Sequence, residues 1–128
     1  MPTANATFRI ASWKEEPYST EPQKMVQAKV ERSFEGDLQG ASHTEYLMAY
    51  TPAGASFVGL ERFSGTLHGK AGTFALQREG KVGADGIVHE SFFIIQGSGT
   101  GELEGISGKG SWHSGHADSY PLTLEYEL

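Results

Sequence analysis

The sequence contains no cysteine, which excludes disulfide bonds, thiolate zinc sites and thiol catalysis. No hydrophobic run approaches the roughly 20 residues of a membrane-spanning helix, and no segment shows the periodicity of an amphipathic helix. Lys and Arg number 10 against 16 Asp and Glu, and the basic residues are scattered along the chain. With a net charge of −6 the protein is poorly suited to phosphate backbones and anionic lipids. We therefore expect neither nucleic acid nor a membrane as a partner.

Signals for targeting and for cofactors are equally scarce. The N-terminal residues lack the basic and apolar stretches of a secretory signal, so we expect a cytoplasmic protein. The glycine-rich segment 97–110 has neither the dinucleotide-binding spacing nor the Gly-Lys-Ser/Thr of a P-loop, and its two glutamates would repel phosphate. We interpret it as a sharply bent strand or barrel corner and expect no cofactor. No Gly-x-Ser-x-Gly motif supports acyl transfer.

Apolar and polar residues alternate with a period of two between turn signals, which is typical of half-buried β-strands. The clearest case is Met25 to Phe34, where Val26, Ala28, Val30 and Phe34 share one face. The other predicted strands are 7–13, 38–50, 56–67, 73–79, 87–96 and 121–128. A chain of 128 residues is one domain by size. Because closure removes exposed strand edges, we predict an all-β fold over residues 1–128, a single antiparallel up-and-down β-barrel, with a two-sheet sandwich as the alternative.

Short aromatic and glycine-containing motifs extend from the first predicted strand to the last. They are Ser12-Trp13, Glu16-Pro17-Tyr18, Gly36-Asp37-Leu38, 45–50, 57–62, Gly65-Thr66-Leu67, Gly72-Thr73-Phe74, 97–103, Tyr120-Pro121 and 124–128. Together they resemble a bacterial family of unknown function whose fold is grouped with the barrels related to allene oxide cyclase. The resemblance implies an up-and-down barrel. It implies no activity, because a shared fold does not determine function.

The segment Thr51-Pro52-Ala53-Gly54 predicts a tight hairpin, because proline presets the turn and glycine tolerates positive φ. In the register that this turn favours, His43 lies opposite Arg62 with Glu45 diagonally adjacent on the same face. Glu45 and Arg62 then form a surface or partly buried ion pair. A slip of one residue would exchange the two faces.

The opposite face of this hairpin places Glu61 across from Thr44 and beside Tyr46, Phe57 and Phe63. An aromatic set of this kind belongs inside a barrel, so we predict that Glu61 points inward. Hydroxyl groups of Tyr46 and Thr44 are its predicted hydrogen-bond donors. Burial would raise the pKa of the carboxyl group and suit it to proton transfer, which makes Glu61 the candidate catalytic residue.

Other candidate site residues are aromatic or histidine side chains. Trp112 and Trp13, with Tyr18, Tyr46, Tyr50, Tyr120 and Tyr126, line an apolar cavity or simply fill the core. His89 lies in the most apolar strand, and we expect it to be an interior histidine. The loop 113–118 contains two histidines and an aspartate, but a short loop places metal ligands poorly, so we expect solvent there and no metal.

Three functions remain open at this point. The first is a barrel that binds a small apolar or aromatic molecule, the second a cofactor-independent isomerase or cyclase, and the third a solid structural barrel that forms oligomers. The candidate ligand-binding residues are Tyr46, Thr44, Phe57, Phe63, Glu45, Arg62, His89 and Trp112. The strand 87–96 is apolar on both faces, so we predict a homo-oligomer with this strand at or near the interface, unless residues 1–7 cover it.

Overall fold

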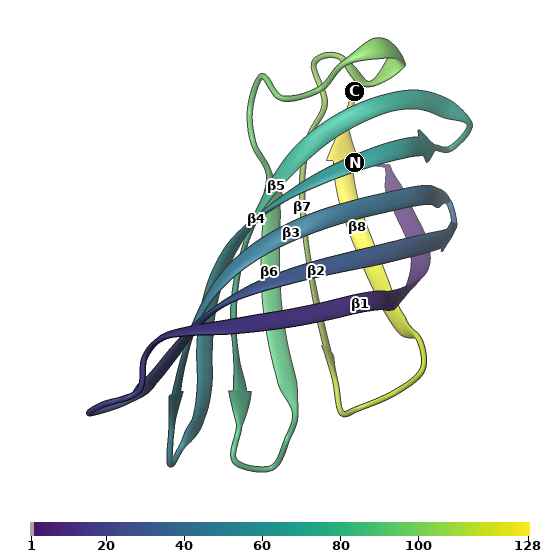
Figure 1. Ribbon diagram of the computed structural model, residues 1–128. Helices are drawn as coiled ribbons and strands as arrows, with labels where there is room; N and C mark the ends of the chain where they lie inside the picture. The colour runs from purple at the N-terminus through teal and green to yellow at the C-terminus, as the bar shows by residue number, and fades with distance from the viewer. Residues whose placement is uncertain (1) are drawn as a thin grey trace.

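Eight antiparallel strands follow one another around a closed barrel, with β8 returning to pair with β1 (Figure 1). The strands are β1 (Thr3–Ser19), β2 (Lys24–Gly36), β3 (Leu38–Thr51), β4 (Gly54–Leu67), β5 (Lys70–Gly83), β6 (Val88–Ile94), β7 (Ser107–Ser114) and β8 (Tyr120–Glu127). The structure, a computed structural model, describes residues 2–128. The predicted all-β barrel is confirmed. None of the described helical segments is long and apolar enough to span a membrane.

The hairpin of β3 and β4 has the predicted register, with His43 opposite Arg62 and Thr44 opposite Glu61. Strand β7 was not predicted as a separate strand, because Gly108 and Gly110 take two of its inward positions and Trp112 alone among these positions is large and apolar. A Cβ atom on Gly110 would lie 2.5 Å from the Phe92 ring, so the ring occupies the space that the glycine leaves. Absence of a side chain therefore hides the alternation of β7 from sequence analysis.

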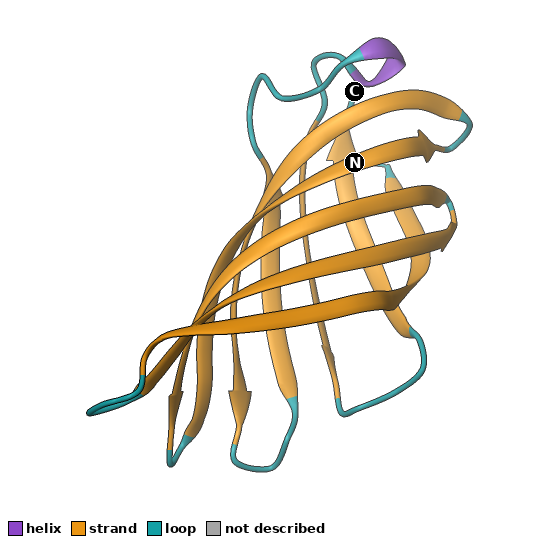
Figure 2. Ribbon diagram, in the orientation of Figure 1, coloured by secondary structure: helices purple, strands orange, loops and turns teal. Residues whose placement is uncertain are grey.

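The glycine-rich connection between β6 and β7 is a loop over residues 95–106 that contains one 3-10 turn, η1 (Gly101–Leu103) (Figure 2). The prediction of a bent strand or barrel corner is wrong for this part, and only the residues from Ser107 onward form a strand. Leu103 and Ile106 are buried in the core. The loop thus closes the end of the barrel at which β1 begins and β8 ends, toward the top of Figure 1.

The interior contains two apolar clusters. The upper cluster, which we call the packed half, includes Phe8, Phe34, Phe63, Phe74, Leu76, Phe92, Leu103, Ile106, Leu122 and Leu124. The lower cluster, the open half, comprises Val26, Ala28, Val30, Tyr46, Met48 and Phe57 with Tyr50, Ala55, Val82 and Val88 packed against it. The open half lies toward the β3–β4 and β5–β6 hairpins at the bottom of Figure 1.

The outer face of the barrel carries several large apolar side chains. Leu47, Val58, Leu60 and Phe93 are all about half exposed. Residues 3–8 do not cover them, because this segment pairs with β8 as part of the barrel wall. The alternative that residues 1–7 cover strand β6 is therefore wrong for the described residues 2–7, and Met1 lies outside the described part of the chain.

Candidate functional site

Four charged side chains lie inside the barrel between the two apolar clusters. Arg32, Glu61, Arg78 and Glu90 are each at most 3 % exposed and come from β2, β4, β5 and β6. Each occupies an inward position of its strand, in line with buried apolar neighbours such as Val30 before Arg32. We call this set, with the hydroxyl groups and the indole that bind it, the polar layer.

Arg78 is at the centre of the polar layer. Its Nε donates to Glu61 Oε1 at 2.6 Å and its Nη1 donates to Glu90 Oε1 at 2.8 Å. Ser42 Oγ donates to the other oxygen of Glu61 at 2.5 Å. Two arginines and two glutamates balance in charge, which is the condition for keeping buried ions stable away from water.

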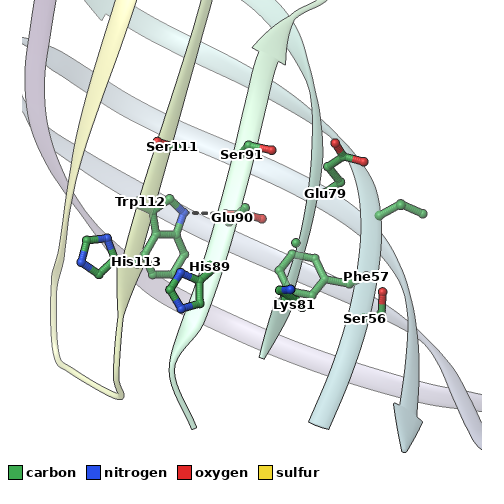
Figure 3. Close-up of a pocket in the computed structure, with 12 residues that line it drawn as sticks. Ser56, Phe57, Glu79, Lys81, His89, Glu90, Ser91, Ser111, Trp112 and His113 are labelled. Atoms are coloured by element: carbon green, nitrogen blue, oxygen red, sulfur yellow. Dashed lines mark hydrogen bonds between the residues drawn. The ribbon is translucent and has the colours of Figure 1, made fainter. Parts of the chain in front are cut away.

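Glu90 and Arg32 bind the aromatic and hydroxyl groups of the layer. The Tyr46 hydroxyl donates to Glu90 at 2.5 Å and the Trp112 indole N–H at 2.6 Å, the bond drawn in Figure 3. Arg32 Nη1 donates to Thr44 Oγ1 and Nη2 to the Tyr46 hydroxyl, both at 2.8 Å. The Tyr46 hydroxyl therefore bridges an arginine and a carboxylate.

The arginines determine the protonation state of Glu61. Burial by itself would raise the pKa of this carboxyl group, but the charges of Arg78 and Arg32 and the bonds from Ser42 and Arg78 outweigh it and hold the pKa below its usual value. The predicted raised pKa is therefore wrong, because the carboxylate is paired rather than isolated. Its donors also differ from the prediction, since Ser42 binds Glu61 while Thr44 and Tyr46 accept bonds from Arg32.

The open half contains a cavity of about 190 Å³. Its walls include Trp13, Met48, Phe57, Val82, Val88 and Trp112. Arg32, Tyr46 and Glu90 of the polar layer also line it. A Cβ atom on Gly59 would lie 2.5 Å from the Tyr46 ring, so the absence of a side chain at Gly59 makes space for this ring. The cavity therefore has mostly apolar walls, with polar groups on one side.

A bulge in β1 brings Trp13 to the cavity. The register shifts between Ile10 and Ser12, which turns Trp13 toward Val30 and the interior, where its ring stacks on Tyr46 with centroids 6.2 Å apart. Glu15 accepts bonds from the Trp13 indole at 3.0 Å and from the Tyr50 hydroxyl at 2.5 Å. Burial and this bond raise the pKa of Tyr50 to about 12, so Tyr50 remains a neutral donor. Glu15 thus fixes the Trp13 and Tyr50 rings at the rim of the open half.

The packed half has almost no empty volume of this kind. The void that Glu61 and Arg78 share with Phe63, Phe74 and their neighbours measures only about 10 Å³. Glu61 is thus on the filled side of the polar layer and does not line the cavity. The carboxylate that lines the cavity is Glu90.

Several predicted ligand-binding residues lie inside the barrel. Tyr46, Phe57 and Trp112 line the cavity. Thr44 is buried in the polar layer, and Phe63 is buried in the packed half against Phe34 and Phe74. Glu61, Thr44 and Tyr46 point inward as predicted.

The other predicted residues are on the outer face. Glu45 binds His43 and Gln27 rather than Arg62, which is exposed. His89 is exposed, so the prediction of an interior histidine is wrong: Val88 and Glu90 take the inward positions, and His89 stacks on His113 of β7 at 5.8 Å. Both histidines line a shallow outer groove across β4 to β7 (Figure 3). Within residues 2–128 no group of three or more His, Asp or Glu side chains is arranged to hold a metal ion.

Arg32, Arg78 and Glu90 were not predicted as site residues, although their positions along the strands indicate that they point inward. Arg32 has the same parity as Val26, Ala28 and Val30 along β2. Arg78 and Glu90 likewise share their parity with buried residues of β5 and β6. A charged residue on the apolar face of a predicted strand thus marks the polar layer.

Comparison with known proteins bears on this architecture. A model of the family described as "Protein of unknown function (DUF3224)" matches residues 4–126. The crystal structure of a protein of unknown function from the DUF3224 family, from Shewanella oneidensis MR-1 at 1.84 Å resolution, is similar with a TM-score of 0.85. It is 23 % identical over 100 % of this chain and 98 % of its own, a similarity that shows the fold alone. No curated protein matches the sequence.

Proposed function

Because the chain belongs to the DUF3224 family, for which no function is described, we propose a function from the geometry of the barrel: it binds one small aromatic molecule in the cavity of its open half. The cavity is the observation that supports this proposal. Its volume of about 190 Å³ exceeds the ~150 Å³ of an engineered apolar cavity that holds benzene. It is smaller than the ~300 Å³ of typical pockets for drug-sized ligands. A ligand with a single ring and one small substituent fits this range.

The walls and the polar layer give such a ligand both affinity and orientation. Phe57, Trp112 and Met48 offer apolar contact, while polar groups lie on one side only. Tyr46 is held by Arg32 and Glu90, and the rim residue Trp13 is held by Glu15. Side chains already fixed before binding lose little entropy on binding, which favours affinity.

The enzyme alternative has less support from the same geometry. The isomerase hypothesis invokes an interior carboxyl group that exchanges a proton with the ligand. Glu61 does not line the cavity, and Glu90 already accepts bonds from Arg78, Tyr46 and Trp112. The relation in fold to allene oxide cyclase stays a prediction and transfers no activity. The third hypothesis, a structural barrel with a solid core, agrees only with the packed half.

A second copy of the chain is the proposed cover of the outer apolar face. Leu47 and Val58 are cross-strand partners, Leu60 follows on β4, and Phe93 projects from β6. Four half-exposed apolar side chains of this size on one sheet are typical of a protein interface. The homo-oligomer predicted from the apolar strand 87–96 is therefore retained as a proposal.

Titration with acetophenone, followed through the methyl resonances of Met48, Val82 and Val88, tests the binding function. We expect saturable shifts of these methyl groups in the wild type. Val88→Trp fills the cavity and should abolish the shifts, while Val58→Trp, on the outer face, should leave them unchanged. Absence of shifts in a folded wild-type protein, or equal shifts in both variants, would contradict the proposal.

A further inference from the structure

The strands at the closure of the barrel are hydrogen-bonded over only part of their length. Strand β1 pairs with β8 from Thr3 to Phe8, although β1 itself extends to Ser19. Beyond this paired part, β1 bends away from β8, as Figure 1 shows. Strand β7 likewise pairs with β8 only from Ser107 to Ser111. Within the described chain, residues 9–19 therefore pair with β2 on one edge and with no strand on the other, which we call the free edge of β1.

The free edge of β1 borders the cavity of the open half. Ile10 and Trp13 line the cavity from this edge, and Trp112 of β7 and Tyr120 at the start of β8 also line it. Ile10 is 37 % and Trp13 is 42 % exposed, and the other lining residues are less exposed than these two. The cavity therefore meets solvent beside the free edge of β1.

A free strand edge presents main-chain N–H and C=O groups that another strand can bind. Where such an edge binds a peptide, main-chain hydrogen bonds give affinity and pockets for alternate side chains give specificity. Pro17 has no N–H, which limits regular pairing to residues 9–16. The register shift between Ile10 and Ser12 interrupts the edge once more. This edge therefore suits a short extended segment better than a long strand.

We infer that the free edge of β1 binds an extended peptide and that the cavity holds a phenylalanine side chain of that peptide. The inference rests on the proposed function, because a benzyl side chain is a single ring with one small substituent, and it makes the ligand part of a polypeptide. Side chains alternate between the two faces of a strand, so the bound segment directs one of them into the barrel beside Trp13.

The charges beside the free edge favour a basic segment. Glu15 lies two residues beyond Trp13 and accepts bonds from two neutral donors, the Trp13 indole and the Tyr50 hydroxyl. Within the described chain Glu15 forms no ion pair, and Lys24 stands over the Tyr50 ring instead, 5.3 Å from its centroid. The net charge of −6 also attracts a cationic peptide. A lysine two residues from the phenylalanine shares its face and lies toward Glu15.

Three peptides test the inference. The first is acetyl-Lys-Thr-Phe-Thr-Lys-amide, in which either strand direction brings a lysine toward Glu15. The second has alanine in place of phenylalanine, and the third carries methyl groups on its three central amide nitrogens. We expect the first to bind roughly tenfold more tightly than the second, as for burial of one aromatic side chain. We expect a similar advantage over the third, roughly tenfold for the loss of two main-chain hydrogen bonds.

NMR locates the bound peptide. With the first peptide, edge-facing amide protons of residues 9–16 should exchange more slowly, and the methyl resonances of Met48 and Val88 should shift. Val88→Trp fills the cavity and should reduce binding of the first peptide to that of the second. Val58→Trp, on the outer face, is the matched control and should leave binding unchanged. If Val88→Trp does not fold, the comparison of the three peptides on the wild type decides.

The outcomes separate this inference from the proposed function. Equal binding of the first and second peptides, or of the first and third, overturns the inference. Slow exchange at the edge-facing amides in the free protein also overturns it, because the edge would already be covered. If acetophenone enters the cavity and the first peptide does not bind, the inference fails while the proposed function stands. Absence of methyl shifts with both ligands overturns both.

Discussion

In the packed half of the barrel, Phe63 packs edge-to-face against Phe34 and at a tilt against Phe74, and the void beside these rings measures about 10 Å³. In the open half, Tyr46 and Phe57 stand in a T-shaped pair beside a cavity of about 190 Å³. Both halves have aromatic residues at inward positions, and Phe57 and Phe63 are even on the same strand, β4. Residue type alone therefore does not decide whether a small barrel is filled.

The ends of the barrel account for much of the difference. At the upper end the loop between β6 and β7 inserts Leu103 and Ile106, which are at most 2 % exposed. At the lower end β3 passes into β4 through a turn at residues 52–53, too short to cover the opening. A long connection fills the packed half, and tight hairpins leave the other half open.

The polar layer separates the two regions. It keeps Glu61 and Arg78 on the filled side and presents Arg32, Tyr46 and Glu90 to the cavity. The layer adds no net charge, because its two arginines match its two glutamates. The free energy lost by removing these four charges from water is offset only if each charged side chain retains its partners.

The largest expected effect comes from breaking this layer. Glu61→Gln leaves Arg78 and Arg32 with one carboxylate fewer, so we expect a loss of about 3–5 kcal/mol in the free energy of unfolding. The matched control is Glu45→Gln on the outer face, where an exposed pair contributes at most about 1 kcal/mol. Urea denaturation measures both. Equal effects of the two substitutions would show that the layer is no more important than surface charge.

A second prediction compares the halves directly. Phe63→Ala should cost about 3–5 kcal/mol, because it leaves a dry hole in a filled core. Phe57→Ala should cost roughly half as much, because it enlarges a cavity that already exists and admits water. Denaturant unfolding of both variants gives the difference. A larger loss for Phe57→Ala would reverse the assignment of packed and open halves.

A third prediction extends the contrast from the interior to the outer wall. If a second copy covers the apolar patch, Phe93→Lys should convert the assembly into monomers at micromolar concentration, because it places a charge in the interface. Light scattering measures the mass, and Ser33→Lys, at an exposed position of β2, is a control for added charge. A monomeric wild type would rule out this interface.

The smallest effect concerns charges on the outer face. Bonds to Glu31 and Glu45 raise the pKa of His43 above its ordinary value of 6.5. The resulting stabilisation is fully present below that unfolded-state value and disappears as pH rises through the raised folded-state pKa. As pH rises over this range, the free energy of unfolding of the wild type should fall by under about 1 kcal/mol relative to that of His43→Gln. Denaturant unfolding of both proteins at about pH 5.5 and about pH 9 measures this difference. If the free energy of unfolding changes equally with pH in the wild type and in His43→Gln, the prediction is wrong.

Much of the fold follows from local signals in the sequence. The β3–β4 hairpin was predicted to the residue, because Pro52 and Gly54 specify the turn and period-two alternation assigns the faces. Strand β7 escaped prediction because Gly108 and Gly110 occupy inward positions. Alternation reveals a strand only where side chains are large enough to mark its two faces.

The site was only partly predictable. The inward position of Glu61 follows from the hairpin register, but its partner Arg78 depends on how β4 pairs with β5. The Tyr46–Glu90 bond joins residues 44 apart in sequence across the barrel interior. Contacts across the interior, and the volume left between them, depend on how the barrel closes and on the packing of all eight strands. No spacing in the sequence contains that information.

Methyl NMR under xenon pressure tests the central contrast most directly, because xenon enters apolar cavities without needing a polar partner. The account predicts xenon-dependent shifts for Met48, Val82 and Val88, which line the cavity. It predicts none for Leu76, Leu122 and Leu124 of the packed half. Shifts of equal size in both sets, or no shift in the first, would contradict an open half beside a filled one.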